Sequence, residues 1–548
     1  MKPSSVAVTL FLLALVLYTF TLQPSLTWGD GIRLQREAIT AESFIFAEMV
    51  EVTFAPDPWP FARLGVAAWD HPLYVIIGHL LVQSLPMFDA LWLVNFVSAL
   101  FGAGAIALFF YWIYRHLGSM VAALFAALAL AVSHTFWWHA ATPEVYTLFA
   151  FLLLLTILLY ERYEETGRHR YLNGAAFVLG LGASNHLLAL LAVGAWGIRR
   201  LGAGKLGIRD WRLANNFQSL ISCIIFFLLG FSPYLIQFFR LLRTFSITEV
   251  MGPAVGATFL QGSLALTPPL LAQSALSYTT FLFFQFSPVG VALGLYGWWQ
   301  GRRLAPALWC VALALYLVYL IFGLVYRVSD QFAFFLGAHL FWAVAMGMGV
   351  AQLANRFSSS RRRWLATGLA LHVALMPVLY AISPGALRAA GITETEFGIP
   401  QVGNDVRDGL TYYLDPNKRG DRQAYAFGQE VLQQLPPQSL VIAEWYVDTD
   451  EYFILRYFAA VEGMRPDVEI VGWPTVDPFQ FDSQLAVQQI QDALGQRPVY
   501  LASLSEEYYA AESLLQRYCV VPQDRLYRVY MPGEASNEAC LSVEEAAE

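Results

Sequence analysis

About eleven apolar stretches dominate the sequence and restrict the chain to membrane proteins, because most are long enough to cross a bilayer as helices. They comprise residues 6–23, 90–114, 118–134, 144–160, 171–184, 186–199, 215–239, 280–299, 306–326, 332–354 and 364–383. Hydrophobic residues make up 57% of the 548 residues and charged residues only 14%. A soluble domain has about 25% charged residues. The sequence therefore predicts a polytopic α-helical membrane protein.

Basic residues gather between these stretches and predict which loops face the cytoplasm. The clusters are Arg115; Arg162, Arg168 and Arg170; Arg199, Arg200, Lys205, Arg209 and Arg212; Arg302 and Arg303; and Arg356, Arg361, Arg362 and Arg363. Placing all of them on the cytoplasmic side satisfies the positive-inside rule. This arrangement puts the N-terminus inside and the C-terminal part outside. No small-residue cleavage site follows residues 6–23, so we interpret them as an uncleaved first span.

Two stretches are interpreted through this rule. Residues 171–199 are flanked by basic residues and broken by Ser184-Asn185-His186, which predicts two short spans joined by an outward tip. Residues 72–86 would form a helix of roughly 22 Å, too short to cross the hydrocarbon. We expect them to lie on the outer leaflet as an interfacial helix, within a first outer loop of residues 24–89.

The pattern changes after residue 383. Residues 384–548 hold roughly 26 acidic against 11 basic residues, whereas residues 1–383 hold roughly 15 against 22. Strand-like segments at 439–445, 467–473, 498–503 and 525–531 alternate with helical patterns at 422–435, 449–463, 480–494 and 505–518. We expect a transmembrane domain over 1–383 and an extracytoplasmic α/β domain with a small, mostly parallel sheet over 384–548.

The four cysteines divide into two kinds. Cys223 and Cys310 lie within apolar stretches, where they are expected to be packing residues. Cys519 and Cys540 lie in the acidic domain and can form a disulfide if that domain is exported. The sequence leaves their pairing open, since it does not place their Cα atoms.

Asp30 is the first candidate for catalysis. It follows the first span in Trp28-Gly29-Asp30-Gly31, at a depth where a carboxylate can stay ionised and still face a lipid-borne ligand. It could be a solvated acid or the N-cap of a helix beginning near Ile32. It could instead be a general base that deprotonates an acceptor hydroxyl while a lipid phosphate leaves. Its position in a loop that returns to the membrane without crossing it favours the base.

Further candidates lie at the expected outer ends of later helices. His71 precedes the interfacial helix, where it could hydrogen-bond a phosphate or cap that helix. Glu144 begins a span, where a carboxylate is unfavourable unless it faces a cavity or a partner, and His186 has the same character. Nearby Trp137 and Trp138 are expected to be interfacial anchors.

Arg327 and Asp330 form the last candidate pair, in a turn between two apolar stretches. They could simply pair with each other, or Arg327 could hold a lipid phosphate through two parallel bonds while Asp330 orients it or a sugar hydroxyl. The sequence contains no HExxH and no cluster of cysteine and histidine, and we expect neither a metal nor another cofactor. No feature predicts nucleic-acid binding.

Several motifs occur together in a recognisable order. They are Gly29-Asp30, His71-Pro72-Leu73-Tyr74, residues 94–100, residues 135–138 with Glu144-Val145-Tyr146, Gly180-Leu181 with Asn185-His186, and residues 326–330. In this order they resemble the GT-C glycosyltransferases of the protein O-mannosyltransferase superfamily, in particular its transmembrane O-mannosyltransferase-like branch with uncharacterised bacterial members. The resemblance covers residues 20–350 well and the tail more loosely, through Arg465-Pro466-Asp467-Val468.

The resemblance implies a polyprenyl-phosphate sugar donor, inverting transfer, and a catalytic aspartate that falls on Asp30. The chain departs from the family pattern in two places. Gly31-Ile32-Arg33 follows Asp30 where the family has Glu or Ser-Gly-Glu. The usual His-Pro-Pro-Gly-Tyr-Pro is shortened to His71-Pro72-Leu73-Tyr74.

We therefore expect a multi-pass enzyme of a bacterial-type plasma membrane that moves a hexose, mannose first, from a polyprenyl-phosphate donor to an exported protein or glycan. Asp30 would be the base. The residues expected to hold the donor are His71, Glu144, His186, Arg327 and Asp330. Two alternatives remain: a binder of lipid-linked sugars without catalysis, and a transporter or flippase, which would place charges deep within spans.

Overall fold

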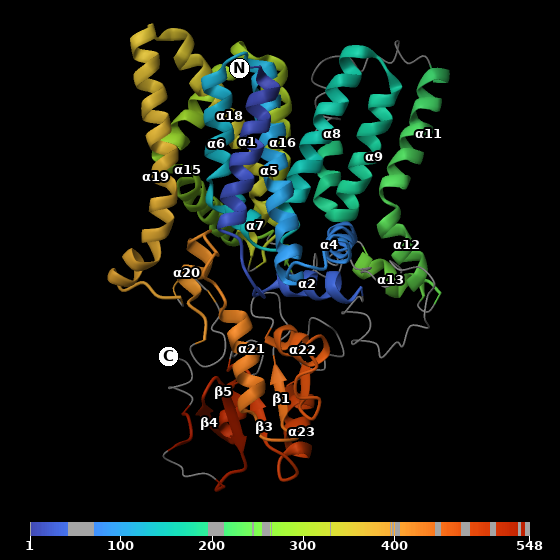
Figure 1. The fold of residues 1–548 in the computed structure, drawn as a ribbon, viewed down its shortest axis with the longest axis vertical. Helices are drawn as coiled ribbons and strands as arrows, with labels where there is room; N and C mark the ends of the chain where they lie inside the picture. Colours follow the sequence, from blue (N-terminus) through green and yellow to red (C-terminus); the bar gives the residue numbers. More distant parts are fainter. Residues whose placement is uncertain are drawn as a thin grey trace. The chain divides into compact units, whose positions relative to one another are not determined.

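The computed structural model describes residues 2–41, 71–194, 213–243, 246–254, 263–264, 266–328, 330–394, 396, 399, 406–443, 451–472, 483–504, 511–534 and 539–542. The chain forms two compact units (Figure 1). The first comprises residues 1–22 and 37–382, and the second comprises residues 23–36 and 383–548. The expected first outer loop is therefore divided between the units, and its residues 42–70 lie outside the described part.

The first unit is built from helices. In chain order they are α1 (Pro3–Phe20), α4 (Pro72–Ser84), α5 (Ala90–Leu117), α6 (Met120–Ala131), α7 (His134–Ala141), α8 (Tyr146–Thr166), α9 (His169–Asn185), η1 (Leu187–Leu190), α11 (Leu213–Gly230), α12 (Ser232–Leu241), α13 (Ile247–Ala254), α15 (Pro268–Leu304), α16 (Pro306–Val325), α17 (Gln331–Phe334), α18 (Leu336–Arg356) and α19 (Ser359–Ala389). A further helix, α2 (Asp30–Thr40), begins in the second unit and ends in the first.

Within the described residues, seven helices are long and apolar enough to span a membrane: α1, α5, α8, α15, α16, α18 and α19. The number rises to nine if two bent pairs each form one span, α6 with α7 at 58° and α11 with α12 at 68°. Of the expected spans, 171–184 corresponds to α9, which has only 17 residues, and 186–199 lies partly outside the described part. The short helix expected over 72–86 is α4, with 13 residues.

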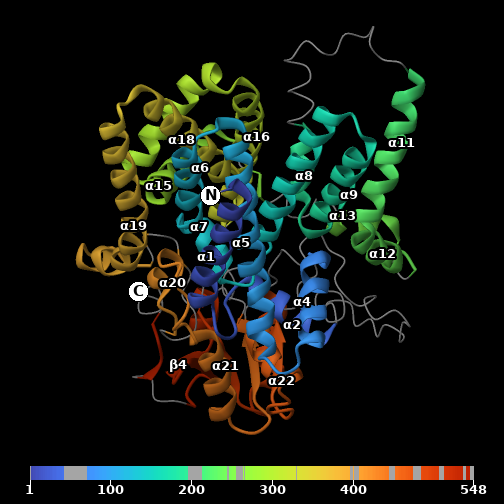
Figure 2. The ribbon, with the colours of Figure 1, turned by 45° about the horizontal axis from the view of Figure 1, so that its top comes forward.

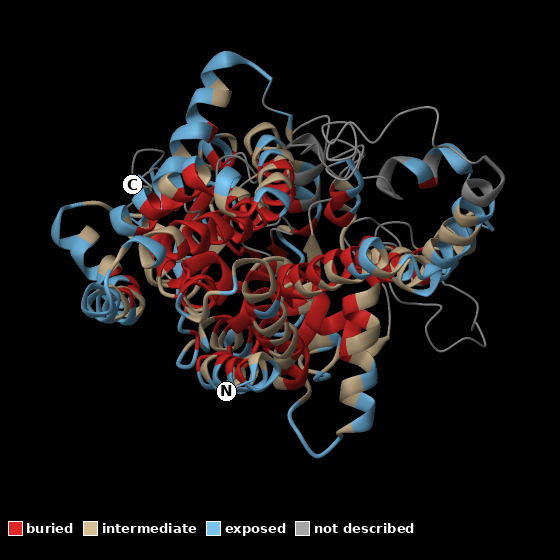
Figure 3. Ribbon diagram, turned by 90° about the horizontal axis from the view of Figure 1, so that it is seen from above, coloured by how far each residue is buried: buried red, intermediate tan, exposed pale blue. Residues whose placement is uncertain are grey.

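The helix α18 forms the centre of this unit, because every residue from Leu336 to Ala351 is buried. It packs against α6, α15 and α16, and Figure 3 marks the buried parts of the chain in red. On the other side of α5, α8 lies beside α9, and α9 beside α11 (Figure 2). The bulk of α19 is exposed, as expected for a helix that faces lipid.

The packing of α15 on α18 depends on small residues, as is common between membrane helices. A Cβ added to Gly297 would overlap the carbonyl oxygen of Ala345, and one added to Gly349 would overlap that of Leu293. The two backbones therefore touch without intervening side chains. Any larger residue at either glycine must push the helices apart.

We expect Gly297→Ala to destabilise the protein by about 1–3 kcal/mol, the usual effect of overpacking a tight interface. The measurement is thermal unfolding of the full chain in detergent. Gly368→Ala is the matched control, because a Cβ at this exposed position of α19 meets no described atom within 4 Å. Equal melting temperatures for the two variants would contradict the close approach of α15 and α18.

The second unit contains a five-stranded sheet with strand order β2-β1-β3-β5-β4. Its strands are β1 (Leu440–Ala443), β2 (Glu469–Gly472), β3 (Val499–Leu501), β4 (Cys519–Gln523) and β5 (Leu526–Tyr530), and its helices are α20 (Gly409–Leu414), α21 (Gln423–Gln434), α22 (Glu451–Ala460), α23 (Ser483–Ala493) and α25 (Ala511–Arg517). The strand β1 runs parallel to β2 and β3, whereas β5 runs antiparallel to β3 and β4.

The expectation of a mostly parallel sheet is therefore only half right, because β5 runs antiparallel both to β3 and to β4, a strand that was not predicted. This strand contains Pro522, which cannot donate a ladder hydrogen bond and argues against a strand in a sequence pattern. In the structure β4 is the edge strand, where proline is tolerated. A two-residue turn at Asp524-Arg525 joins it to β5.

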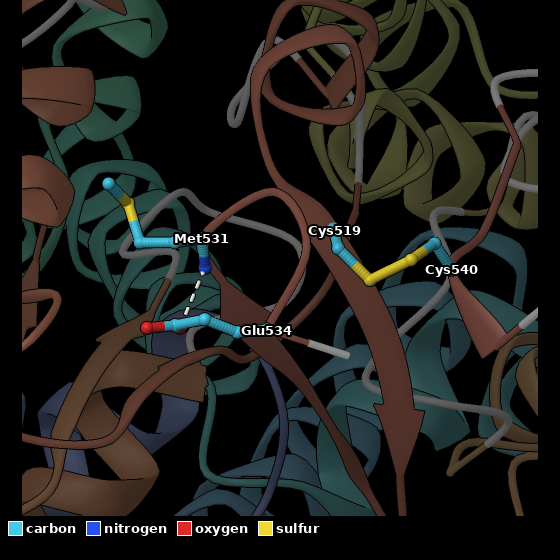
Figure 4. The surroundings of a disulfide bond; sticks show 4 residues. All are labelled: Cys519, Met531, Glu534 and Cys540. Carbon is cyan, nitrogen blue, oxygen red and sulfur yellow. Dashed lines mark hydrogen bonds between the residues drawn. A yellow bond between two sulfur atoms is a disulfide. The ribbon is translucent and has the colours of Figure 1, made fainter. Parts of the chain in front are cut away.

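Cys519 and Cys540 form a disulfide (Figure 4). This bond attaches the end of the described chain to β4, and the Leu541 N–H also donates to the Val520 carbonyl at 2.9 Å. The pairing that the sequence left open is thus formed. Cys223 and Cys310 are free and half-buried.

Residues 23–36 are an integral part of the second unit. Gln23 donates to the Asp421 carbonyl at 3.0 Å, and the Thr27 hydroxyl lies 3.0 Å from the Tyr412 hydroxyl. Trp28 is buried beside Phe427, with 5.7 Å between ring centroids. The segment that follows α1 is therefore held by residues almost 400 positions later in the chain.

The second unit also contains a buried lysine, which contacts the same Tyr412. Lys418 is 2% exposed and donates to the Tyr412 and Asp415 carbonyls. Burial lowers the pKa of Lys418 from 10.5 to about 8, although Asp421, Asp415 and Asp408 oppose the change. Burial also raises the pKa of Asp421, an effect that Lys418 opposes.

We expect the second unit to become more stable as the pH rises from about 8 to about 10. In this window the unfolded chain keeps a proton on Lys418 that the folded chain releases, so raising the pH favours folding. The measurement is denaturant unfolding of the full chain at pH values across this window, monitored by a spectroscopic signal from the second unit. Lys418→Met should flatten the curve, and a wild-type curve without a rise would contradict the buried lysine.

Candidate functional site

Several of the predicted residues surround Tyr146, the first residue of α8. The carboxylates of Glu144 and Asp330 both lie close enough to act electrostatically on the Tyr146 hydroxyl. The ring of His186 lies 5.5 Å from that of Tyr146, and the ring of His71 stacks on His186 at 5.1 Å. The structure thus places four of the five expected donor-binding residues in one region of the first unit, where His71 is connected to Tyr146 only through His186.

The backbone of Glu144 is held by Ser98 of α5. The Glu144 N–H donates to the Ser98 hydroxyl at 2.9 Å, and that hydroxyl donates back to the Glu144 carbonyl at 2.9 Å. The hydroxyl of Tyr74 in α4 lies 2.8 Å from the Ser98 hydroxyl. Thr142 is extended and precedes a proline, which ends α7 and turns the chain toward this anchor. The position of Glu144 is therefore set by α4 and α5.

His71 adopts a left-handed backbone conformation, with φ 47° and ψ 57°, at the start of α4. This conformation costs about 1–3 kcal/mol for a residue other than glycine. The side chain makes no capping bond to the helix. Its Nδ1 lies 2.7 Å from the Asn185 carbonyl instead. The capping alternative is therefore excluded, and the strain is compensated by an attachment to α9.

These contacts also assign the tautomers of both histidines. A carbonyl only accepts, so Nδ1 of His71 carries a hydrogen and Nε2 of the neutral ring is an acceptor. The Leu188 N–H donates to Nδ1 of His186 at 3.1 Å, so the hydrogen of its neutral ring lies on Nε2. No described residue accepts from this Nε2–H. The stacked pair thus combines one Nε2 donor with one Nε2 acceptor.

Arg327 and Asp330 do not form an ion pair with each other. The backbone N–H of Arg327 donates to the Ser263 carbonyl at 2.7 Å. Its half-buried guanidinium makes neither an ion pair nor a hydrogen bond with any described residue. No described contact joins Arg327 to the cluster around Tyr146. Its charge is available to a ligand.

Every residue of the helix α7 is buried in the first unit. The expectation that Trp137 and Trp138 are interfacial anchors is therefore wrong, since each is only 5% exposed. The Trp137 indole N–H donates to the Thr21 hydroxyl at 2.8 Å. Aromatic residues are common both at membrane interfaces and in buried packing, so composition alone could not distinguish the two.

Sequence reasoning also missed Tyr146 and His139, whose rings lie 4.6 Å apart. Tyr146 was part of the Glu144-Val145-Tyr146 motif but received no role of its own. A signal was present, because Tyr146 lies only two residues after Glu144, at the same end of the apolar stretch.

Two side chains hold the N-terminus of α7. The Thr135 N–H donates to the Gln285 side-chain oxygen at 2.9 Å, and the His134 N–H donates to the Tyr380 hydroxyl at 3.1 Å. That hydroxyl donates in turn to the Gln285 carbonyl at 3.2 Å. The helix α15 is kinked at Ser287, which has φ 56°. The kink leaves the Gln285 carbonyl available for this bond.

Asp30 lies in the second unit, at the first residue of α2. It forms an ion pair with Arg33, one helical turn later. The Arg33 guanidinium also lies over the ring of Phe453 in α22, 5.6 Å from its centroid. Arg33 is one of the residues at which the chain departs from the family pattern. The departure therefore places a cation directly on the predicted base.

The comparisons with known proteins agree with these motifs. Residues 69–200, which include His71, Glu144, Tyr146 and His186, match the family described as protein O-mannosyl-transferase TMEM260 N-terminal domain. The chain is 23% identical over 501 residues to protein O-mannosyl-transferase TMEM260 of Mus musculus. The alignment covers 85% of this chain and 62% of the mouse protein. The chain thus spans less than two thirds of that relative.

Two solved structures share the fold. ArnT from Cupriavidus metallidurans bound to undecaprenyl phosphate superposes with a TM-score of 0.54 at 15% identity, covering 96% of this chain and 99% of ArnT. The apo state of the same protein gives a TM-score of 0.52 at 16% identity, covering 96% and 98%. With the family match, this likeness identifies the chain as a multi-pass membrane protein of the GT-C fold, similar to the protein O-mannosyl-transferases.

Proposed function

We propose that the protein is a glycosyltransferase that moves a hexose, mannose first, from a polyprenyl-phosphate donor to an exported protein or glycan. The observation that carries the proposal is the cluster of His71, His186, Glu144 and Asp330 around Tyr146, most of it within the family-matched segment. The mouse relative is named for O-mannosyl transfer, and an ArnT structure holds undecaprenyl phosphate. A polyprenyl phosphate that carries a sugar would be a donor that combines the sugar transfer of the one relative with the lipid phosphate bound by the other.

The phosphate of the donor needs hydrogen-bond donors, because its oxygens only accept. The Nε2–H of His186 is such a donor without a described acceptor. His71 lies beside this donor, with its ring stacked on that of His186 at 5.1 Å. The guanidinium of Arg327 offers bidentate binding. We assign these three groups to the phosphate.

The carboxylates of Glu144 and Asp330 would repel a phosphate and suit the sugar. A hexose hydroxyl donates well to a carboxylate, and such charge-assisted bonds are stronger than neutral ones. Both carboxylates act on the Tyr146 hydroxyl, which can itself donate to or accept from a hydroxyl. We assign Glu144, Asp330 and Tyr146 to the sugar.

Asp30 is proposed as the general base. Its carboxylate takes the proton of the acceptor hydroxyl as the hydroxyl oxygen attacks the anomeric carbon of the donor. The bond between that carbon and the phosphate oxygen breaks, and its electron pair leaves with the phosphate. Attack from the face opposite the leaving group inverts the anomeric centre. The assignment rests on the position of Asp30 in the sequence.

We also propose that the site and the second unit face the extracytoplasmic side. The basic loops support this sidedness through the positive-inside rule. The disulfide between Cys519 and Cys540 supports it as well, since such bonds persist in oxidising compartments.

A second candidate is a binder of lipid-linked sugars that does not catalyse transfer. The ion pair of Asp30 with Arg33 favours this candidate, because a carboxylate held by a guanidinium is a weaker base. The two candidates share donor binding and differ in turnover.

Asp30→Asn should lower transfer from radiolabelled polyprenyl-phosphate mannose by about 10²–10⁴-fold, the usual contribution of a general base. Donor binding should stay unchanged. Asp89→Asn is the control, because Asp89 caps α5 and asparagine caps a helix equally well. If Asp30→Asn and wild type transfer the sugar at equal rates, Asp30 is not the base. If wild type binds the donor but transfers no hexose, the binder is correct.

Arg327→Gln should weaken binding of sugar-free polyprenyl phosphate by about tenfold or more, because a charge-assisted phosphate contact contributes about 1.5–3 kcal/mol. Binding is measured with the radiolabelled lipid and the purified protein. Arg303→Gln removes the same charge from an exposed position at the end of α15 and should bind normally. Equal affinities for the two variants would remove Arg327 from the phosphate site.

A further inference from the structure

His139 in α7 is completely enclosed yet makes no hydrogen bond. Its side chain is 1% exposed, and neither Nδ1 nor Nε2 has a partner among the described residues. Buried polar atoms are almost always paired, because an unpaired one loses the hydrogen bonds it made with water. The imidazole of His139 therefore destabilises the fold unless something else bonds to it.

The ring of His139 is the last in a row of four that leads through the candidate site. It lies 4.6 Å from Tyr146, which lies 5.5 Å from His186, which stacks on His71 at 5.1 Å. On its other side His139 stacks on Phe332 at 5.5 Å, with the planes 9° apart. The unpaired imidazole thus lies between Tyr146, which is assigned to the donor, and the apolar ring of Phe332.

The chemistry of this ring selects the kind of ligand. A protonated imidazole here would be a buried charge, and no described carboxylate forms an ion pair with it. The neutral ring offers one N–H donor and one acceptor nitrogen. A phosphate oxygen can use only the donor, whereas a hydroxyl can donate and accept. A sugar, which carries several hydroxyls, fits both nitrogens.

We propose that His139 binds a hydroxyl of the hexose on the lipid donor and thereby helps the protein to distinguish the loaded lipid from the free one. The inference rests on the proposed function and names the part of the donor that this ring recognises. The neighbouring Tyr146, Glu144 and Asp330 are assigned to the same sugar, so His139 extends the sugar site into α7.

The chain contains a matched histidine that lacks this position. His339 in α18 is also 1% exposed, and both of its ring nitrogens are also unpaired among the described residues. Its ring contacts are with Tyr278, Phe286 and Phe335, and none is with Tyr146. Comparing the two histidines separates the effect of an unpaired buried imidazole on stability from its effect on sugar binding.

The test compares His139→Phe with His339→Phe in the purified full chain. Both should raise the melting temperature, because each replaces an unpaired polar ring by an apolar ring of similar size. Affinities are then measured for polyprenyl-phosphate mannose and for sugar-free polyprenyl phosphate. His139→Phe should lose about tenfold in affinity for the loaded lipid and none for the free lipid, whereas His339→Phe should bind both like wild type.

A third variant, His139→Gln, keeps a donor and an acceptor and should recover part of the preference for the loaded lipid. The inference is overturned if His139→Phe keeps the wild-type ratio of the two affinities, if His339→Phe loses it equally, or if wild type binds both lipids alike. Wild type that binds neither lipid overturns the proposed function and the inference with it. The two failures are thus distinguished by binding of the wild-type protein alone.

Discussion

A broken span must satisfy the backbone groups that its break exposes, because hydrocarbon offers them no hydrogen bonds. The 58° bend between α6 and α7 creates this requirement within the first unit. Gln285 and Tyr380 meet it at the start of α7, and the Thr142 hydroxyl donates to the Trp138 carbonyl at its end. Without these bonds α7 could not turn inward, and the start of α8, which carries Tyr146, would lose its support.

The kink of α15 also helps to satisfy the backbone groups at the start of α7. Ser287 takes a backbone conformation that is unfavourable for a residue other than glycine, directly before Pro288. The break at Ser287 leaves the Gln285 carbonyl available to the Tyr380 hydroxyl, which also receives the His134 N–H. One strained residue in α15 thus provides the acceptor that fixes α7, and α7 in turn presents His139 to Tyr146.

Hydropathy predicted the polytopic fold, because the length of an apolar stretch is a local property of the chain. The short helix α4 and most of the strands followed from local patterns as well. Contacts between distant residues were not predictable in this way. The attachment of Thr27 to Tyr412, which places Asp30 in the second unit, leaves no periodicity in either segment. The burial of α7 was hidden because an aromatic helix has the same composition inside a bundle as at an interface.

The candidate site shows why its residues were easier to name than their roles. Carboxylates and histidines at the ends of apolar stretches stand out because they are unfavourable there, which made His71, Glu144, His186 and Asp330 candidates. Tyr146 and His139 resemble ordinary packing residues in sequence. Their importance depends on what they contact or fail to contact, and only the structure records that. Among the described residues, left-handed His71 and unpaired His139 mark the two ends of one row of rings. Both break a local rule of stability, as residues that serve a ligand commonly do.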